Sequence, residues 1–447
     1  MKAPFKITML MAGGLIVASY AFGFLSHKYR LPPSGLLTSV RAWCGEFSGV
    51  EGDGRPSRGK WFRSRQREHD LSRETVERLS ALGYLSGYEP PTDLVNVTVH
   101  VPTLAQRGLS LYNSGHAPEA WIIDMQGNRL HRWRYTFADA FPSYPREVTE
   151  PSYQWWRHVH PYRDGGLLAI FEGLGLIRLD RDSNLLWAVA GGFHHDVFVE
   201  EDGTIYALTR EEKVIERIHD SKPVLEDFIL VLDADGEPRR KISLLAAWER
   251  SAYAPLLRNM RETGDVFHTN TLNLLDGTIG TQLLFRRGSA LISLRNLHAI
   301  AVVDLEREEI VWALTGMWAF QHQPTLLPNG NLLLFDNAGA GEMSRVLEID
   351  PLSQSIAWAY RGTEENGFFS ATLGDCQRLT NGNTLITESE AGRAFEVTPD
   401  LEIVWEYYNP ERAGEQGEFI ATLFEMVRLP SEFGADWLDS STQVGGS

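Results

Sequence analysis

The chain has 447 residues, of which 43% are hydrophobic and 23% are charged, a globular composition that can bury a large core. Its formal net charge of −17 excludes the basic surface that general nucleic-acid binding requires. Aromatic residues make up 11% of the chain, which favours β-sheets or a site that handles aromatic rings.

Residues 1–28 predict a membrane anchor. Residues 7–25 carry no charged side chain, and a helix of this length just spans a hydrocarbon layer of about 30 Å. Residues 19–21 fit a signal-peptide cleavage site only loosely, so we expect an uncleaved anchor, with a cleaved signal peptide as the alternative. Long folded domains cross membranes largely regardless of charge, so we expect the rest of the chain to be exported, to the periplasm or another extracytoplasmic space.

Residues 29–96 predict a linker that contains one helix. Gly, Ser, Pro and Arg are frequent up to Arg67, as is typical of flexible segments. Apolar side chains then follow helical spacing at Leu71, Val76, Leu79 and Leu82, which predicts an amphipathic helix over 70–85. We expect this helix to dock on the following domain, with binding of a partner as the alternative.

Residues 97–430 repeat a unit of two strands. Each copy is an apolar strand ending in Asp, a polar turn and a second apolar strand ending in Trp, over 121–133, 176–187, 228–242, 301–312, 346–358 and 395–405. The third copy lacks the Trp, and the sixth has Thr398 in place of Asp. A period of roughly 45–55 residues with about four short strands is typical of β-propellers. The sequence therefore predicts an all-β, six-bladed propeller, followed by a flexible tail over 431–447.

Three histidines precede turn glycines by nearly the same number of residues. His195 and His322 each lie eight residues before the glycine of an Asp-Gly or Asn-Gly turn, and His268 lies nine before one. Because these dipeptides mark hairpin turns, the histidines occupy the same height on equivalent strands, and around a propeller axis they would converge. His158 has the same register, whereas His194 is expected on the opposite face of its strand.

The same register adds further candidate residues. Asn270 lies two residues after His268, and Phe193 and Phe320 each lie two residues before their histidine, so we expect all three on the wall that carries the imidazoles. Arg295 stands in an otherwise apolar stretch, where a guanidinium needs an anion. Since this charge would repel a metal ion, the cluster predicts binding of a phosphate, sulfate or carboxylate group and no metal.

Five motifs, in order between about residues 99 and 410, together resemble the bacterial arylsulfotransferases that use no nucleotide sulfate donor. They are GLSLYNSGHAPEAWIIDMQGNRLHRW, HHD, FHTN, SLRN and QHQP. The resemblance implies a six-bladed propeller with its site at the channel mouth. It also implies transfer of a sulfuryl group from a phenolic sulfate ester to a phenol acceptor through a sulfated histidine.

The resemblance implies a role for each matching residue. His322 would be the nucleophile, His268 and His195 would bind the sulfuryl oxygens or move protons, and Arg295 would hold the sulfuryl group. Aromatic residues would stack on the phenyl rings; the expected substrate-binding positions are His194, Asn270, Phe193, Phe320 and Trp318. No metal or organic cofactor is expected, and the partners would be a small aryl sulfate and a phenol.

Two questions are left open by the sequence. Longer family members carry an N-terminal β domain used for dimerisation, which this chain replaces by the anchor, linker and helix, so the oligomeric state is undecided. The alternative function is a non-enzymatic propeller that binds an anionic ligand or scaffolds a partner at the membrane. A metal-dependent hydrolase of the lactonase type is disfavoured because few carboxylates converge.

Overall fold

The computed structural model describes residues 61–63, 94–144, 151–277, 285–339, 343–363, 367–413, 419–433 and 437–438. All of them fall in one unit, 58–447. The expected anchor at 1–28 and the helix over 70–85 lie outside the described residues and stay predictions. Within the described ranges, no helix is long and apolar enough to cross a membrane.

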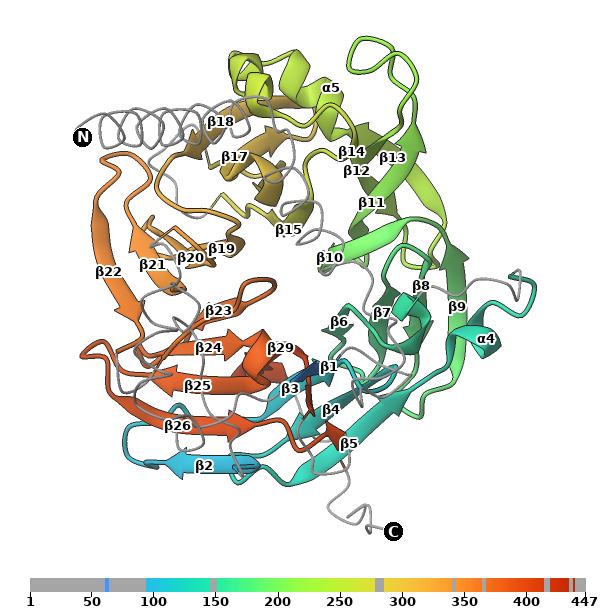
Figure 1. Cartoon of the computed structure of the whole chain (residues 1–447). Coiled ribbons are helices and arrows are strands. Elements are labelled where there is room, and N and C mark those ends of the chain that lie inside the picture. Colours follow the sequence, from blue (N-terminus) through green and yellow to red (C-terminus); the bar gives the residue numbers. More distant parts are fainter. Residues whose placement is uncertain are drawn as a thin grey trace, which may run out of the picture. The chain divides into compact units, whose positions relative to one another are not determined.

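Six antiparallel sheets follow one another around a common axis, which confirms the six-bladed propeller (Figure 1). From its innermost strand outward, blade 1 has β29 (Leu423–Arg428), β3 (Ser110–Ser114), β4 (Glu119–Ile123) and β5 (Arg129–Arg134). In the same direction, blade 2 has β6 (His158–Pro161), β7 (Leu167–Phe171), β8 (Gly175–Leu179) and β9 (Leu185–Ala190). Blade 3 has β10 (Phe193–Val199), β11 (Ile205–Lys213), β12 (Val224–Leu232) and β13 (Pro238–Ser243), with β14 (Gly264–Asp265) beside β12.

The second half of the chain completes the ring. Blade 4 has β15 (Thr269–Leu274), β16 (Ser289–Leu294), β17 (Ala299–Asp304) and β18 (Glu309–Thr315). Blade 5 has β19 (His322–Leu326), β20 (Leu332–Asp336), β21 (Arg345–Ile349) and β22 (Ile356–Arg361). Blade 6 has β23 (Asp375–Arg378), β24 (Thr384–Glu388), β25 (Arg393–Val397) and β26 (Ile403–Tyr408), with β2 (Asn96–His100) outermost.

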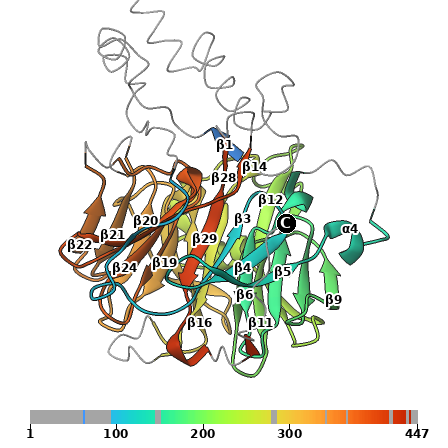
Figure 2. The same ribbon diagram turned by 90° about the horizontal axis from the view of Figure 1, so that it is seen from below.

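Both ends of the described propeller chain close the ring. The late strand β29 is the innermost strand of blade 1, where it pairs with β3. The early strand β2 pairs with β26 at the outside of blade 6. A separate three-stranded sheet of β1 (Trp61–Arg63), β28 (Phe419–Ala421) and β27 (Arg412–Ala413) lies at one rim of the propeller, where Figure 2 shows β1 and β28.

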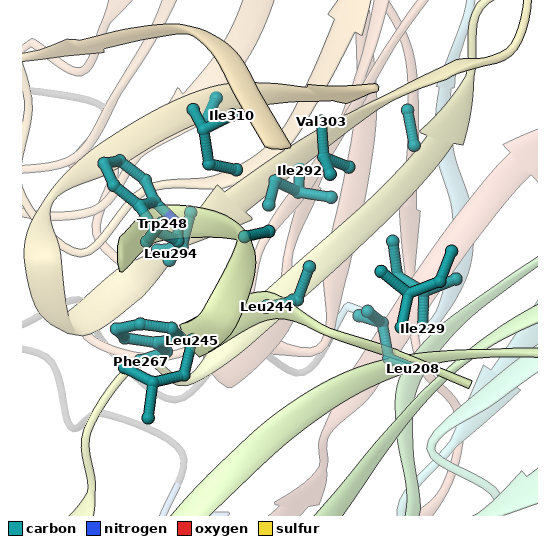
Figure 3. Close-up of a cluster of buried hydrophobic side chains, with 14 of the residues drawn as sticks. Leu208, Ile229, Leu244, Leu245, Trp248, Phe267, Ile292, Leu294, Val303 and Ile310 are labelled. Carbon is teal, nitrogen blue, oxygen red and sulfur yellow. The ribbon is translucent and has the colours of Figure 1, made fainter. Parts of the chain in front are cut away.

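The apolar core lies between the blades. Six large clusters of buried hydrophobic side chains each combine residues from two neighbouring blades. Between blades 3 and 4 the cluster also includes Trp248 of helix α5 (Leu244–Glu249), which packs near Phe267 and Leu294 (Figure 3). Because neighbouring blades cover both faces of each sheet, most middle strands are buried along their whole length.

The repeated Asp holds the turn between the two outer strands of a blade. Oδ1 of Asp124 accepts the backbone N–H groups of Gln126 and Asn128, at 2.9 Å each. Asp180, Asp233 and Asp350 accept equivalent backbone donors in their own turns. Thr398 replaces Asp in blade 6, and its hydroxyl accepts the N–H of Glu402 at 3.2 Å. The departure from the repeat therefore keeps the side-chain acceptor that the turn needs.

In four blades the repeated Trp links the blade to the next one. Nε1 of Trp405 in blade 6 donates to the carbonyl of Met125 in blade 1 at 3.0 Å. Trp133, Trp187 and Trp358 donate in the same way to turn carbonyls of the following blade, at Gly165, Ala234 and Pro399. The Trp of this repeat therefore joins neighbouring blades in addition to filling the space between them.

Short helices lie between strands, both between blades and within them, and one follows the last strand. They are α4 (Phe137–Ala140), α5, and the 3-10 turns η2 (Pro151–Gln154), η3 (Ala254–Asn259), η4 (Arg295–Leu297), η5 (Ser389–Ala391) and η6 (Ser431–Phe433). Part of the segment expected to be a flexible tail is packed: Phe433 is buried, and the ring of Trp437 lies 5.9 Å from that of Trp133. Two bulky aromatic side chains in this segment account for the difference, because they cover the core between blades 1 and 2.

We predict that Trp405→Phe lowers the free energy of unfolding by about 1–3 kcal/mol. The change leaves the carbonyl of Met125 without this hydrogen-bond donor and opens a small cavity between blades 6 and 1. Trp187→Phe is the matched control: it removes the same kind of bond at a partly exposed position, so its cost should be below about 1 kcal/mol. Denaturant midpoints of the full chain measure both. Equal midpoints for the two variants would contradict the linking role of Trp405.

Candidate active site

The inner strands of blades 3, 4 and 5 bring the predicted histidines together. His195 lies in β10, His268 directly precedes β15, and His322 begins β19. The ring centroids of His195 and His268 are 4.7 Å apart. Burial lowers the pKa of His322 most, and Arg295 and His268 are near enough to lower it further. All four residues therefore belong to one cluster near the propeller axis.

The inner strands are irregular at the points where they carry these side chains. His195 and His268 have left-handed backbones, with φ of 56° and 52°, and Phe320, just before β19, has φ of 57°. The pairing register shifts between Phe193 and Val197 of β10. Non-glycine residues rarely adopt this conformation, and where they do the strain often accompanies a functional site.

The bulge in β10 overturns the prediction that His194 faces away from His195. In a regular strand, neighbouring side chains point to opposite faces. Here the left-handed turn at His195 rotates the two rings toward each other, and their Nδ1 atoms are 2.9 Å apart. His194 is buried behind His195, with 1% of its residue surface exposed.

One side-chain amide fixes the proton position on His322. Nδ1 of His322 lies 2.7 Å from Oδ1 of Asn337, which follows β20. The amide cannot be flipped, because its Nδ2 donates to the backbone carbonyls of Ser370 and Leu373 at 2.8 and 2.5 Å. An amide oxygen only accepts, so Nδ1 of His322 carries the hydrogen and Nε2 presents a lone pair.

The surroundings of His322 keep its imidazole uncharged. Burial, together with the charge of Arg295, holds the pKa of His322 well below its ordinary range, although the bond to Asn337 acts in the opposite direction. Burial and the nearby Arg157 lower the pKa of His195 in the same way. Neutral imidazoles are the form that can act as nucleophile or base.

His268 is oriented by a carboxylate. Its Nδ1 lies 2.6 Å from Oδ2 of Asp265, and its backbone N–H donates to Oδ1 of the same group at 2.8 Å. Asn296 supports this loop by donating to the carbonyl of Asp265 at 2.8 Å. With Nδ1 facing the carboxylate, Nε2 of His268 is the atom available to a ligand, as in the His–Asp pairs of hydrolases. His268 is 26% exposed at its side chain, so the site reaches solvent on this side.

Arg295 lies at the end of β16 and opens the 3-10 turn η4, rather than lying within a strand. Its guanidinium lies 4.7 Å from the ring centroid of Phe320 and donates to Oδ1 of Asn296 at 3.3 Å. Nδ1 of His298 accepts the N–H of Phe320 at 3.0 Å, which fixes that aromatic residue. No carboxylate among the described residues forms an ion pair with Arg295, so its charge is available to an anion.

Two further arginines, which no sequence motif indicated, add positive charge to the cluster. Arg157 is buried, and its charge acts on both His195 and His322. Arg210 lies 3.9 Å from Asp265 and acts on His194. In the sequence, the only indication for Arg157 is the histidine that follows it. Nothing indicates Arg210, because this residue lies on β11, one strand farther from the axis than β10.

Three of the expected substrate-binding residues have other surroundings. Phe193 is 1% exposed and belongs to the apolar cluster between blades 2 and 3. Trp318 is buried in the cluster between blades 4 and 5. Asn270 donates to the carbonyl of Gln321 at 2.8 Å and so ties blade 4 to blade 5. The bulges break the simple two-residue periodicity from which Phe193 and Asn270 were predicted, and Phe320 is the aromatic residue beside Arg295.

His158 belongs to a carboxylate cluster on the same inner strands. Its Nδ1 lies 2.9 Å from Oε2 of Glu425, and its Nε2 lies 3.5 Å from Oδ1 of Asp196. Burial lowers the pKa of His158, but the two carboxylates outweigh it and raise the value to about 9. Burial and Glu425 raise the pKa of Asp375, on β23, to about 7. His158 is thus a cation held by carboxylates, unlike the neutral imidazoles.

The arrangement suits an oxyanion with several peripheral oxygens. Arg295, Arg157 and His268 lie near enough to His322 to add to the effect of burial on its pKa, and the ring of His195 packs against that of His268. Such a site stabilises negative charge and offers one nucleophilic atom. In the described ranges, no group of His, Cys, Asp and Glu side chains is arranged to hold a metal ion.

Several solved structures are similar to this chain. A protein of unknown function from Bacteroides caccae is 13% identical with a TM-score of 0.45, and the match covers 71% of this chain and 98% of that one. The Cps50 (Swd1) β-propeller domain of Myceliophteria thermophila is 11% identical with a TM-score of 0.42, over 74% and 100% of the two chains. A search of curated proteins by sequence found no match.

The family comparison is more specific. The model of the arylsulfotransferase (ASST) family matches residues 158–410. This range is more than half of the 447 residues and includes His195, His268, Arg295 and His322. The chain therefore belongs to the arylsulfotransferase family.

Proposed function

We propose that the protein transfers a sulfuryl group from a phenolic sulfate ester to a phenol, with Nε2 of His322 as the nucleophile. The observation that carries this proposal is the bond between His322 and Asn337, which leaves Nε2 unprotonated. Membership of the arylsulfotransferase family supports the class of reaction. Attack of Nε2 on sulfur forms an N–S bond and breaks the ester S–O bond, which releases the first phenol.

The second half-reaction reverses the first with a different phenol. Because Nδ1 of His322 keeps its hydrogen, the sulfated ring carries a positive charge and is a good leaving group. Asn337 accepts from that Nδ1 in both states, so the ring need not turn between the two steps. A covalent intermediate of this kind divides one transfer into two similar ones.

Positive charge around His322 supports the transition state. Sulfuryl transfer, like phosphoryl transfer, spreads negative charge over peripheral oxygens, so positioned donors provide much of the catalysis. We assign Arg295 and Nε2 of His268 to these oxygens, with Arg157 as a more distant charge. Phe320 lies under Arg295 and offers a ring on which a substrate phenyl group can stack.

His322→Ala should abolish transfer, because it removes the nitrogen that we propose to carry the sulfuryl group. We expect turnover of 4-nitrophenyl sulfate with a phenol acceptor to fall by at least about 10³-fold. Mass spectrometry of the donor-treated wild type should find one added SO₃ group on the peptide that contains His322.

The control is His219→Ala, which removes a partly exposed histidine from the segment between β11 and β12. This variant should keep wild-type turnover. Tight binding of aryl sulfates by the wild type, without turnover or an adduct, would contradict the proposal and favour a non-enzymatic anion-binding propeller.

The rate of His322 sulfation should not fall as the pH drops through 6.5. The folded pKa of His322 is lowered, so the ring stays unprotonated and nucleophilic below the pH at which an ordinary histidine becomes charged. Single-turnover release of 4-nitrophenol, measured between about pH 6 and 7.5, tests this expectation. An acidic limb with a midpoint near 6.5 would contradict it.

Asn337→Asp provides a sharper version of the same test. The aspartate keeps an oxygen on Nδ1 of His322 but adds a negative charge, which should raise the pKa of His322. An acidic limb should then appear, with the rate lost as the pH falls through the raised value. Asn337→Leu, which removes the acceptor altogether, should instead lower the rate by about 10–100-fold at every pH. Wild-type profiles for both variants would show that Asn337 does not orient His322.

A further inference from the structure

Three buried side chains form a chain that starts at His195 of the site and leads to β12. Nδ1 of His195 lies 2.9 Å from Nδ1 of His194. Nε2 of His194 in turn faces Oδ1 of Asp227, on β12, at 3.7 Å. The His194 and Asp227 side chains are each 1% exposed. A shift of roughly 0.5–1 Å would bring the last pair within hydrogen-bond distance.

Asp227 has one oxygen to spare for this chain. Its Oδ2 accepts the N–H of Thr269 at 2.8 Å, which joins blade 3 to blade 4. Its Oδ1 is buried and has no hydrogen bond among the described residues. The backbone of Thr209 also lies beside the His194 ring. Two buried polar atoms that face each other are stable only if they share a hydrogen bond. We therefore expect a proton between Oδ1 of Asp227 and Nε2 of His194.

Burial and most nearby charges oppose a positive charge on either imidazole; the exceptions are Asp265 and Glu172, whose Oε1 lies 3.8 Å from Nδ1 of His195. Burial lowers the pKa of His194 and of His195 well below the ordinary range, and the charges of Arg157, Arg210 and His268 add to the effect. Asp265, on β14, favours a proton on His194 and disfavours an anion on Asp227. Burial and Asp265 raise the pKa of Asp227 to about 7. A proton that enters at His195 is therefore most stable on Asp227.

We propose that Asp227, His194 and His195 form a proton relay that donates a proton to the departing phenolate and takes one from the incoming phenol. This inference rests on the proposed function and identifies His195 as the residue that exchanges the proton with substrate. His194 and Asp227 act through it. The two Nδ1 atoms can bond only if one ring donates and the other accepts, so the tautomers of His194 and His195 are coupled.

The proton count balances over the two half-reactions. Before sulfation, Asp227 is protonated, His194 carries its hydrogen on Nδ1, and His195 carries its hydrogen on Nε2. As the S–O bond breaks, Nε2 of His195 gives its proton to the phenolate oxygen, Nδ1 of His195 takes the proton of His194, and Nε2 of His194 takes the proton of Asp227. The acceptor phenol then returns one proton along the same path. Neither imidazole is charged in the initial or final state.

Donors with different leaving groups test the relay. The amide introduced by Asp227→Asn would keep the bond from Thr269 and point its NH₂ group at His194, which locks His195 with a hydrogen on Nε2 that it cannot pass on. Asp227→Asn should therefore lower the sulfation rate with phenyl sulfate by about 10²-fold, since general acid catalysis contributes this much for a basic leaving group. With 4-nitrophenyl sulfate, whose phenolate leaves without help, the rate should fall by less than about 5-fold.

Two controls separate this effect from damage to the fold. Asp304→Asn neutralises another buried carboxylate, which caps a turn after β17 through the N–H groups of Glu306 and Arg307, and should leave the ratio of the two rates unchanged. His194→Gln interrupts the relay at its centre and should reproduce the selective loss even if Asp227→Asn folds poorly. Equal losses with both donors, or no loss with phenyl sulfate, would overturn the proposal.

The outcome also distinguishes this inference from the proposed function. If wild-type protein sulfates His322 with both donors, the proposed function stands and the ratio of rates decides the relay. If wild-type protein releases neither phenol and forms no adduct, the proposed function is overturned, and the relay that rests on it is overturned with it.

Discussion

The inner strand of every blade is a buried edge strand, and its backbone groups must find partners outside its own sheet. Side chains of the neighbouring blade supply them. Glu425 accepts the N–H of Val159, Asp196 that of Leu272, and Asp227 that of Thr269, at 2.8–3.1 Å. A buried N–H without a partner would cost about 1–3 kcal/mol, so this requirement forces carboxylates and amides toward the axis.

The same requirement organises the chemistry of the site. Asn337 satisfies the carbonyls of Ser370 and Leu373 and, with its remaining oxygen, fixes the tautomer of His322. Oδ2 of Asp227 accepts the backbone N–H of Thr269, and its Oδ1 faces the ring of His194. Groups that close the gaps between blades thus also orient the imidazoles. The apolar clusters between blades hold this polar ring rigidly, since each cluster packs two sheets together.

The repeat of Asp turns and Trp strands was sufficient to predict six blades, because each copy repeats one local unit. Spacing from turn glycines also predicted that His195, His268 and His322 would meet. It could not predict the left-handed residues that break strand alternation, and so missed the contact between His194 and His195 and the packing of Phe193 between blades 2 and 3. Asn337 and Asp227 were missed because their partners lie 15 and 33 residues away along the chain, at no fixed spacing. Contacts between blades leave no periodic signal within one blade.

The central claim is that His322 is neutral, with its hydrogen on Nδ1 and a free lone pair on Nε2. Long-range ¹H–¹⁵N correlation spectra of the histidine rings report this tautomer directly, with His322→Gln to assign the signals. We predict at pH 7 a protonated Nδ1 and an unprotonated Nε2 for His322. A hydrogen on Nε2, or on both nitrogens, at that pH would contradict the account.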